Sequence, residues 1–302
     1  RRRQPEAALL TPESRIVFVM VGLPARGKSF IGRKIHRYCT WLGISAAIFN
    51  LGEYRRATIG AGMPSSFFAH DNSDGLTTRS QLADRALEDM RVFFDSDDGH
   101  VAIFDATNTT RERRELVRTR VEGWGGRAIF VESRCDDEEL IEQNIRATKL
   151  TSPDYLGWDA EDAVRDFRAR IAQYEKVYEP VGDHDEDIPY ISMHNVRKVT
   201  VNRLDSYLGS RVAFFLMALN LRTRKIYFSR HGESEFNVVG KIGGDPDITA
   251  RGQRYATALG KWMGDRVARL WTSTLRRTVQ TGATVNAPHR RSIGLLDEIN
   301  AG

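Results

Sequence analysis

The segment Gly22-Leu23-Pro24-Ala25-Arg26-Gly27-Lys28-Ser29 matches GxxxxGK[ST], the pattern of a phosphate-binding loop. Its glycines let the backbone wrap closely, so that successive N–H groups point at phosphate oxygens. In such a loop the lysine, here Lys28, reaches the β- and γ-phosphates of a nucleotide, and the hydroxyl, here Ser29, binds Mg²⁺. The segment therefore predicts a nucleotide site. A plain glycine-rich turn is the alternative.

A carboxylate, Asp105, closes the apolar run Val101-Ala102-Ile103-Phe104. The carboxyl end of a parallel strand faces the ligand crevice of an α/β sheet. Beside a phosphate-binding loop, such a carboxylate holds Mg²⁺ or accepts a proton from the attacking hydroxyl. The alternative role for Asp105 is to cap the helix that follows.

Arginines cluster in two segments that we expect to be loops after strands: Arg55 and Arg56, and Arg111, Arg113 and Arg114. An acceptor that carries its own phosphate would be held by such side chains, because the guanidinium fork matches phosphate oxygens. Taken singly, each of them is more often a solvated surface charge.

A second candidate centre is Arg230-His231-Gly232-Glu233, which follows an apolar run at residues 225–229. A neutral imidazole can attack a phosphoryl group and become phosphohistidine. Arginines would stabilise the transferring charge, and a carboxylic acid would protonate the leaving alcohol. Glu298 is the best candidate for that acid, whereas a histidine packed in a core is the alternative for His231.

The pattern of elements around these motifs predicts an α/β fold. Apolar runs at 16–21, 46–49, 101–104 and 128–131 alternate with helical patterns at 29–41, 78–94, 111–121, 138–148 and 160–178. This rhythm is typical of a mainly parallel sheet with right-handed crossovers. After a polar loop at 179–190, an edge strand at 198–202, a helix at 204–221 and a junction at 222–224, we expect a strand at 225–229, a helix at 249–263, a strand at 268–271 and a helix from 275. The expected domains are a basic tail (1–14), a P-loop kinase domain (15–222) and part of a second domain (223–302).

Composition narrows the class of partner. The 302 residues carry a formal net charge of +5, with a pI of about 9.3, which favours anionic partners such as nucleotides and sugar phosphates. The two cysteines, Cys39 and Cys135, form no CxxC pattern, which suits a reducing, cytoplasmic compartment. No apolar run is long enough to span a bilayer, and the arginine-rich start reads as a free tail rather than a signal peptide.

Read together, several strings resemble the bifunctional 6-phosphofructo-2-kinase/fructose-2,6-bisphosphatase family over residues 15–302. They are VGLPARGKS (21–29), FNLGEYRR (49–56), FDATNTTRERR (104–114), SPDY (152–155), RHGES (230–234) and IGGD (242–245). The resemblance implies a P-loop kinase domain followed by an incomplete phosphoglycerate-mutase-like histidine phosphatase domain. The implied reaction converts ATP and fructose 6-phosphate, with Mg²⁺, into fructose 2,6-bisphosphate. A homodimer is compatible with the resemblance.

The resemblance also implies roles for individual residues. In the kinase domain, residues 22–29 match the nucleotide contacts, Ser29 and Asp105 the magnesium side, and Lys28, Asp105 and Cys135 the catalytic group. Asn144 and Lys149 match the nucleotide-side segment, and Lys149 also reaches the sugar phosphate. The residues that match the fructose 6-phosphate pocket are Arg55, Arg79, Thr107, Arg113, Lys149, Arg170 and Tyr174.

In the second domain, His231 matches the nucleophile and Glu298 the proton donor, while Arg230, Asn237, Gly243 and Arg277 match substrate contacts. The sequence ends at Gly302, before the family's second catalytic histidine and further contacts of that pocket, so weak or absent bisphosphatase activity is expected for the chain as given. A further departure is Ala69-His70, where the family commonly has Arg-Pro near the acceptor site.

Two other functions remain to be weighed. One is a histidine phosphatase with a degenerate kinase half, although the intact motifs lie in the kinase half. The other is a nucleotide-gated scaffold without turnover, acting on nucleic acid. Such a scaffold would show a Lys/Arg stripe with interleaved aromatic residues, and the sequence by itself shows none. We therefore expect neither a nucleic acid nor a membrane partner.

Overall fold

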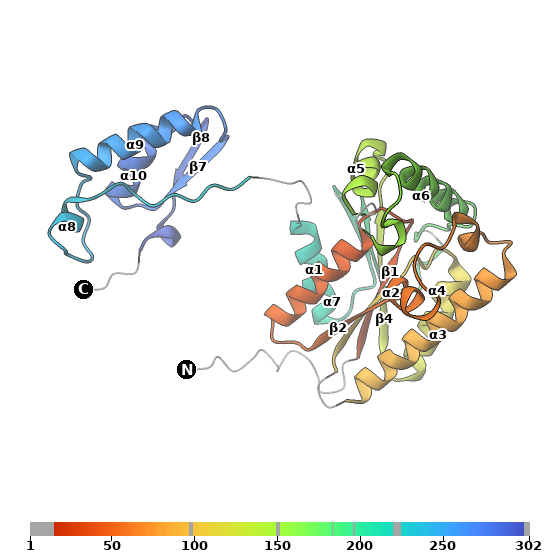
Figure 1. Cartoon of the computed structure of the whole chain (residues 1–302). Helices are drawn as coiled ribbons and strands as arrows, with labels where there is room; N and C mark the ends of the chain where they lie inside the picture. The colour runs from red at the N-terminus through yellow and green to blue at the C-terminus, as the bar shows by residue number, and fades with distance from the viewer. Residues whose placement is uncertain are drawn as a thin grey trace. The chain divides into compact units, whose positions relative to one another are not determined.

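The computed structural model describes residues 15–96, 99–148, 152–182, 184–195, 197–219 and 225–298. It divides into two compact units, Arg1–Leu221 and Arg222–Gly302 (Figure 1). No helix in the described ranges is long and apolar enough to cross a membrane.

The first unit is built on a six-stranded sheet in the order β2-β3-β1-β4-β5-β6. The first five strands run parallel and β6 pairs antiparallel with β5, which confirms the mainly parallel α/β sheet. The central strands β1 and β3 are buried along their whole length, as continuous apolar runs require. The strand bounds are β1 Ile16–Val21, β2 Ala46–Asn50, β3 Val101–Asp105, β4 Arg127–Arg134, β5 Tyr190–His194 and β6 Lys198–Asn202.

Helices cover both faces of this sheet. On one face α1 (Lys28–Trp41) and α7 (Tyr207–Ala218) pack Ile35 and Val212 against strand residues such as Phe18. On the other face lie α3 (Ser73–Asp95) and α4 (Arg111–Gly123). A separate apolar cluster joins α5 (Glu138–Thr148) to α6 (Ala160–Glu175). The remaining elements are α2 (Leu51–Ile59) and the short helices η2 (Ser65–Phe68) and η3 (Pro153–Tyr155).

Three local expectations for the first unit differ from the structure. Arg55 and Arg56 lie on α2 rather than in a loop, because the Asn50 side chain accepts a hydrogen bond from Glu53 N at 3.1 Å and starts a helix immediately after β2. Strand β5 was not expected, since its sequence YISMH mixes polar and apolar residues. Helix α3 begins five residues before the predicted start, at the Asn72 cap.

The second unit contains α8 (Glu235–Val238), α9 (Ala250–Met263), β7 (Arg269–Thr272), α10 (Arg276–Gly282), β8 (His289–Ser292) and η4 (Gly294–Leu296). Strands β7 and β8 pair in parallel. The helix at 249–263 and the strand at 268–271 are confirmed to within a residue. The strand predicted at 225–229 is wrong: these residues pair with no strand in the described part of the chain, and Ile226 and Phe228 are 74% and 93% exposed. An apolar run without a partner ladder leaves its backbone groups to solvent and forms no strand.

Candidate active site

The phosphate-binding loop joins β1 to α1 and has the left-handed backbone that its sequence demands. Gly22, Ala25 and Gly27 have φ values of +129°, +60° and +84°. The loop is anchored from outside: Gly22 N donates to Thr107 O at 2.9 Å, and Asn144 Nδ2 donates to Ala25 O at 3.1 Å. The structure thus brings the predicted nucleotide residues together with Thr107 and Asn144.

The two cations of the loop have different neighbours. Lys28 is 8% exposed and its Nζ donates to Leu23 O at 2.6 Å, so the side chain folds back over its own loop. Arg26 Nε donates to Cys135 O at 3.2 Å, and its guanidinium lies 3.5 Å from the Glu175 carboxylate on α6. Arg26 therefore ties the loop to the end of β4 and to α6, whereas Lys28 stays within the phosphate cradle.

Substituting Gly22 with alanine will destabilise the first unit. An added Cβ would lie 2.5 Å from Ser133 O, at a φ where side chains are strained. Strain alone costs about 1–3 kcal/mol, and the clash with backbone adds to it. Gly125→Ala is the matched control, because Gly125 also has positive φ (+72°) but an added Cβ meets nothing within 4 Å. Urea unfolding should show a clearly larger loss for Gly22→Ala; equal losses would contradict the close contact.

Asp105 is a buried carboxylate at the carboxyl edge of the sheet. It is 5% exposed and pairs in register with Asn50 on β2. The Asn50 amide donates to Asp105 Oδ2 while Asn50 Oδ1 caps α2, so one side chain fixes both. Helix α4 is capped by Thr110, which accepts from Arg113 N at 3.2 Å. Asp105 is therefore not the helix cap that the alternative interpretation required.

Oxygen donors suitable for a divalent cation lie at this edge. Ser29 is in the first turn of α1, and Asp105 ends the neighbouring strand β3. Among the described residues, no group of three or more His, Cys, Asp or Glu side chains could hold a metal. A cation here would have to complete its shell with phosphate oxygens and water, which is how Mg²⁺ binds in kinases. The residues present fit such an ion.

Arg55 forms a buried ion pair in front of the sheet. Its guanidinium is 4% exposed and donates from Nη2 to both oxygens of Asp154, at 2.7 and 2.5 Å, and from Nη1 to Gly60 O at 3.2 Å. Arg56 lies 3.7 Å from the same carboxylate. Burial by itself would raise the pKa of Asp154, but the hydrogen bond and charge of Arg55 lower that pKa below its usual value.

Phe68 is the aromatic centre of an arginine cluster. The Arg170 guanidinium carbon lies 3.5 Å from the Phe68 ring centroid, and that of Arg55 lies 5.8 Å from it. Arg170 Nε is buried without a hydrogen-bond partner among the described residues. A planar guanidinium stacked on a ring keeps its N–H groups in one plane and available to an anion.

Two further arginines complete this cluster. The Arg79 guanidinium donates to Phe68 O at 3.1 Å and to Ala69 O at 3.2 Å, and it lies 6.0 Å from the Tyr174 ring. Burial lowers the pKa of Arg113; Asp84 acts in the opposite direction and Arg79 adds to the lowering. Three arginines thus gather around Phe68 and Tyr174, with Arg113 near enough to Arg79 to be affected by its charge, an arrangement suited to a phosphate group.

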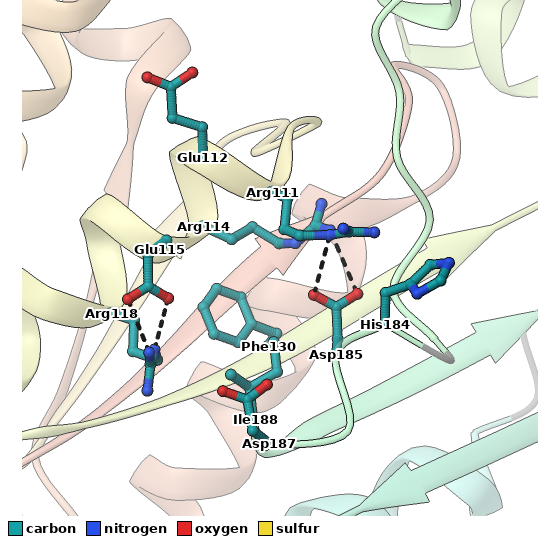
Figure 2. Close-up of a pocket in the computed structure, with 10 residues that line it drawn as sticks. All are labelled: Arg111, Glu112, Arg114, Glu115, Arg118, Phe130, His184, Asp185, Asp187 and Ile188. Atoms are coloured by element: carbon teal, nitrogen blue, oxygen red, sulfur yellow. Dashed lines mark hydrogen bonds and ion pairs between the residues drawn. The ribbon is translucent and has the colours of Figure 1, made fainter.

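Arg111 and Arg114, which sequence reasoning grouped with Arg113, point elsewhere. Successive helical residues project about 100° apart. Arg114, 1% exposed, lies 3.5 Å from Asp185 and donates to Glu179 O at 2.9 Å, and Arg111 lies 4.0 Å from Asp185. Figure 2 shows these side chains beside a pocket of about 340 Å³. In the structure these two side chains hold Glu179 and Asp185 against α4.

Cys135 sits at the end of β4, where it is 9% exposed and packs near Ala25 and Ile141. It lines a second pocket, of about 400 Å³, together with Leu23 and Arg26 of the phosphate-binding loop. Burial raises the pKa of its thiol, although the Asp137 backbone and the charge of Arg26 act in the opposite direction. At neutral pH the thiol of Cys135 is therefore protonated, and the side chain lines the pocket rather than acting as a nucleophile.

Alkylation by iodoacetamide will report these thiol pKa values. Burial raises the pKa of Cys39 to about 12, and that residue is 0% exposed. Because the thiolate is the reactive form, Cys135 should react slowly at pH 8, and its rate should keep rising with pH beyond about 8.5, the value for a free thiol. Peptide mass spectrometry should find Cys39 unmodified at that stage. A Cys135 rate that levels off near pH 8.5, or earlier labelling of Cys39, would contradict this.

The second unit brings together only part of its predicted site. Arg277 is 5% exposed; it donates from Nη1 to Gly244 O at 2.8 Å and from Nη2 to Glu298 at 2.9 Å. His231 Nδ1 lies 2.7 Å from Gly232 O. Asn237 forms a capping box with Ser234 at the start of α8. Arg230 is exposed, and Gly243 has a φ of +82°. Within residues 225–298, no hydrogen bond or ion pair joins His231 to Arg277 or Glu298.

Two family models match the sequence of this chain. A family model described as 6-phosphofructo-2-kinase matches residues 6–223. The chain belongs to the 6-phosphofructo-2-kinase family. A second model, the histidine phosphatase superfamily (branch 1), matches residues 226–302. The fold is therefore α/β, a P-loop kinase domain followed by histidine phosphatase sequence.

Curated relatives of this 6-phosphofructo-2-kinase family chain are named 6-phosphofructo-2-kinase/fructose-2,6-bisphosphatase. Form 4 from Homo sapiens is 43% identical over 291 residues, which is 95% of this chain and 62% of the relative. The Aquarana catesbeiana protein is 42% identical with the same coverage. Form 1 from Rattus norvegicus is 41% identical over 307 residues, covering 100% of this chain and 65% of the relative. The chain thus spans less than two thirds of these relatives' length.

Some residues of this family member's site escaped sequence reasoning or cannot be placed. Lys149 lies outside the described residues. Asn50 and Asp154 were missed as individuals, although both lie in strings that carried the resemblance, and an amide directly after an apolar strand was the available signal for Asn50. Phe68 had no such signal, because its role depends on arginines from α2 and α6.

Proposed function

We propose that the chain transfers the γ-phosphate of ATP to the 2-hydroxyl of fructose 6-phosphate, giving fructose 2,6-bisphosphate. The observation that carries the proposal is the pairing of a phosphate-binding loop with the cluster of Arg55, Arg79 and Arg170 around Phe68 and Tyr174. A nucleotide site alone needs no second cluster of cations. The family match and the names of the relatives support the same reaction.

In the proposed reaction, the loop N–H groups hold the nucleotide phosphates. Lys28 would exchange the Leu23 carbonyl for the β- and γ-phosphate oxygens, where its charge offsets the developing negative charge. Asp105, held by Asn50, would orient the cation or the attacking hydroxyl. Mg²⁺, bound by Ser29 and Asp105, would supply charge neutralisation of the transferring group.

The acceptor would be held by its own 6-phosphate. Arg170, stacked on Phe68, and Arg79, next to Tyr174, would clamp the phosphate, with Arg113 beside them. Asp154 would keep Arg55 in place before substrate enters, because it is the buried counter-ion of that side chain. Thr107, whose carbonyl oxygen accepts a hydrogen bond from Gly22 N, would meet the sugar.

For the second unit, we propose His231 as nucleophile and Glu298 as proton donor of a fructose-2,6-bisphosphatase reaction, with little turnover in this chain as given. The supporting observation is that Arg277 holds Glu298 while His231 is joined to neither. We further propose a cytoplasmic location, in keeping with the free cysteines Cys39 and Cys135.

The test is incubation with ATP, MgCl₂ and fructose 6-phosphate, followed by mild acid. A phosphate on the anomeric C2 is acid-labile, whereas one on C1 is not, so an acid-labile bisphosphate identifies the product. Nucleotide binding without any such product would instead favour the nucleotide-gated scaffold, which the arginine cluster otherwise argues against.

A further inference from the structure

Many surface arginines of the first unit are paired with carboxylates, but those of one face are not, and neither are Arg85, Arg197 and Arg203 elsewhere among the described residues. Arg91, Arg118 and Arg146, for example, each contact a glutamate within 3 Å. In contrast, Arg33, Arg37 and Arg211 have no ion pair with any described residue. Their helices, α1 and α7, contain no Asp or Glu at all.

Exposed apolar side chains lie on the same two helices as these cations. Trp41 on α1 is 77% exposed, and Phe214 and Met217 on α7 are 70% and 58% exposed. Residues 33, 37 and 41 recur at one helical turn along α1, and residues 211, 214 and 217 do so along α7. We call this set the α1/α7 face: Arg33, Arg37, Trp41, Arg211, Phe214 and Met217.

The two helices lie side by side, so the six residues form one surface. Both pack their opposite sides on the same face of the sheet. Tyr38 of α1 stacks on Phe215 of α7 with centroids 4.3 Å apart, and Arg211 Nε donates to Tyr38 Oη at 3.2 Å. Figure 1 shows the two helices as neighbours. Nearly 170 residues separate the two helices in sequence, so the α1/α7 face forms only when the chain folds.

We propose that the α1/α7 face binds the surface of a membrane that contains anionic phospholipids. Cations flanking exposed tryptophan, phenylalanine and methionine match the interfacial region, where arginines contact headgroups and apolar side chains enter the acyl boundary. This surface would attach the protein without any membrane-spanning segment.

Charge and shape argue for this occupant over the others. A second copy docked by the same face would set like charges against each other. Single-stranded nucleic acid is held in positively charged grooves lined by stacking rings, whereas this face is the outer surface of two helices and includes the non-aromatic Met217. The phosphate-binding loop lies at the start of α1, about 20 Å from Trp41 at its end. A membrane at the α1/α7 face therefore leaves the nucleotide site open.

The experiment is co-sedimentation of the whole chain with phosphatidylcholine vesicles that contain either no phosphatidylserine or 30% phosphatidylserine. Binding is expected to the anionic vesicles alone and to weaken with salt. Each cation near an anionic surface is worth about a fivefold change in partitioning, so Arg33→Gln with Arg37→Gln should lower it about 25-fold. Trp41→Ser with Phe214→Ser should lower it at least tenfold. The matched control, Arg85→Gln with Arg165→Gln, removes two exposed cations from α3 and α6 and should stay within about twofold.

Several results would overturn the proposal. They are equal binding to both vesicles, no binding to either at low salt, and an equal loss in the control pair, which would reveal a simple net-charge effect. Retention on single-stranded nucleic acid without vesicle binding would assign the face to the other polyanion. Circular dichroism and the melting temperature check that the surface variants fold. The two substituted pairs are independent, so either one alone can contradict the proposal.

Discussion

If the proposed transfer to fructose 6-phosphate is right, Lys28→Met will lower its kcat by about a thousandfold or more. The lysine ammonium lies within the phosphate cradle, 2.6 Å from Leu23 O and 8% exposed. Removing one preorganised charge from a transferring group costs about 10²–10³ in rate, and phosphoryl transfer relies almost wholly on such charges. Methionine keeps length and apolar volume, so the variant isolates the charge. Initial rates of acid-labile product formation measure the effect.

Lys34→Met is the matched control for this prediction. It makes the same chemical change on the same helix, at a half-buried side chain whose ammonium lies 5.2 Å from the Phe30 ring centroid. Turnover of Lys34→Met should stay within about twofold of the parent. Near-normal turnover of Lys28→Met, or equal losses in both variants, would remove Lys28 from the catalytic group.

Arg170→Ala will raise the KM for fructose 6-phosphate by about 10- to 100-fold with little change in the KM for ATP. Hydrogen bonds to charged groups contribute about 1.5–3 kcal/mol each, and Arg170 offers a stacked guanidinium whose buried Nε has no partner in the described structure. The nucleotide contacts come from a different loop, which explains the expected split between the two substrates. Steady-state kinetics with each substrate varied in turn measure it.

Arg168→Ala is the control on the same helix. Arg168 is 48% exposed and contacts Glu142 at 2.7 Å on the outer side of α6, so neither KM should change by more than about twofold. Equal rises in both KM values for Arg170→Ala would place that residue outside the acceptor pocket. Because Arg170 also packs on Phe68 and Phe167, the melting temperature of the variant should be measured alongside.

The elements that sequence predicts well here are those whose pattern is local. The continuous apolar runs of β1, β3 and β4 and the GxxxxGKS loop needed no knowledge of neighbours. Helix α5 was also predicted with its bounds. The secondary-structure prediction failed where a strand depends on pairing with a segment distant in sequence. Residues 225–229 have strand composition but no ladder, and β5 has little strand pattern yet is completed by β4 and β6.

The candidate site divides in the same way. Lys28, Ser29 and Asp105 could be named from spacing and chemistry, because a loop and a strand end position them. Arg79, Arg170 and Tyr174 lie on helices that look like surface, and only the resemblance picked them out. Their gathering depends on Phe68, to which α2 and α6 each bring an arginine. Arg113 and Arg114 show most directly what sequence cannot predict. They are consecutive residues of one helix, yet Arg113 lies near Arg79 and Arg114 contacts Asp185.

The double contact of Asn50 has a consequence for how the two substrates influence each other. Its carbonyl oxygen starts the helix that carries Arg55, and its amide holds Asp105. If binding of the sugar phosphate displaces α2, the Asn50 side chain would transmit that displacement to the carboxylate of Asp105. Thermodynamic linkage is reciprocal. If the bound acceptor changes the affinity for the metal–nucleotide complex by some factor, the bound complex must change the affinity for the acceptor by the same factor. Asn50→Ala should therefore weaken the cooperativity between substrates beyond its effect on either one alone.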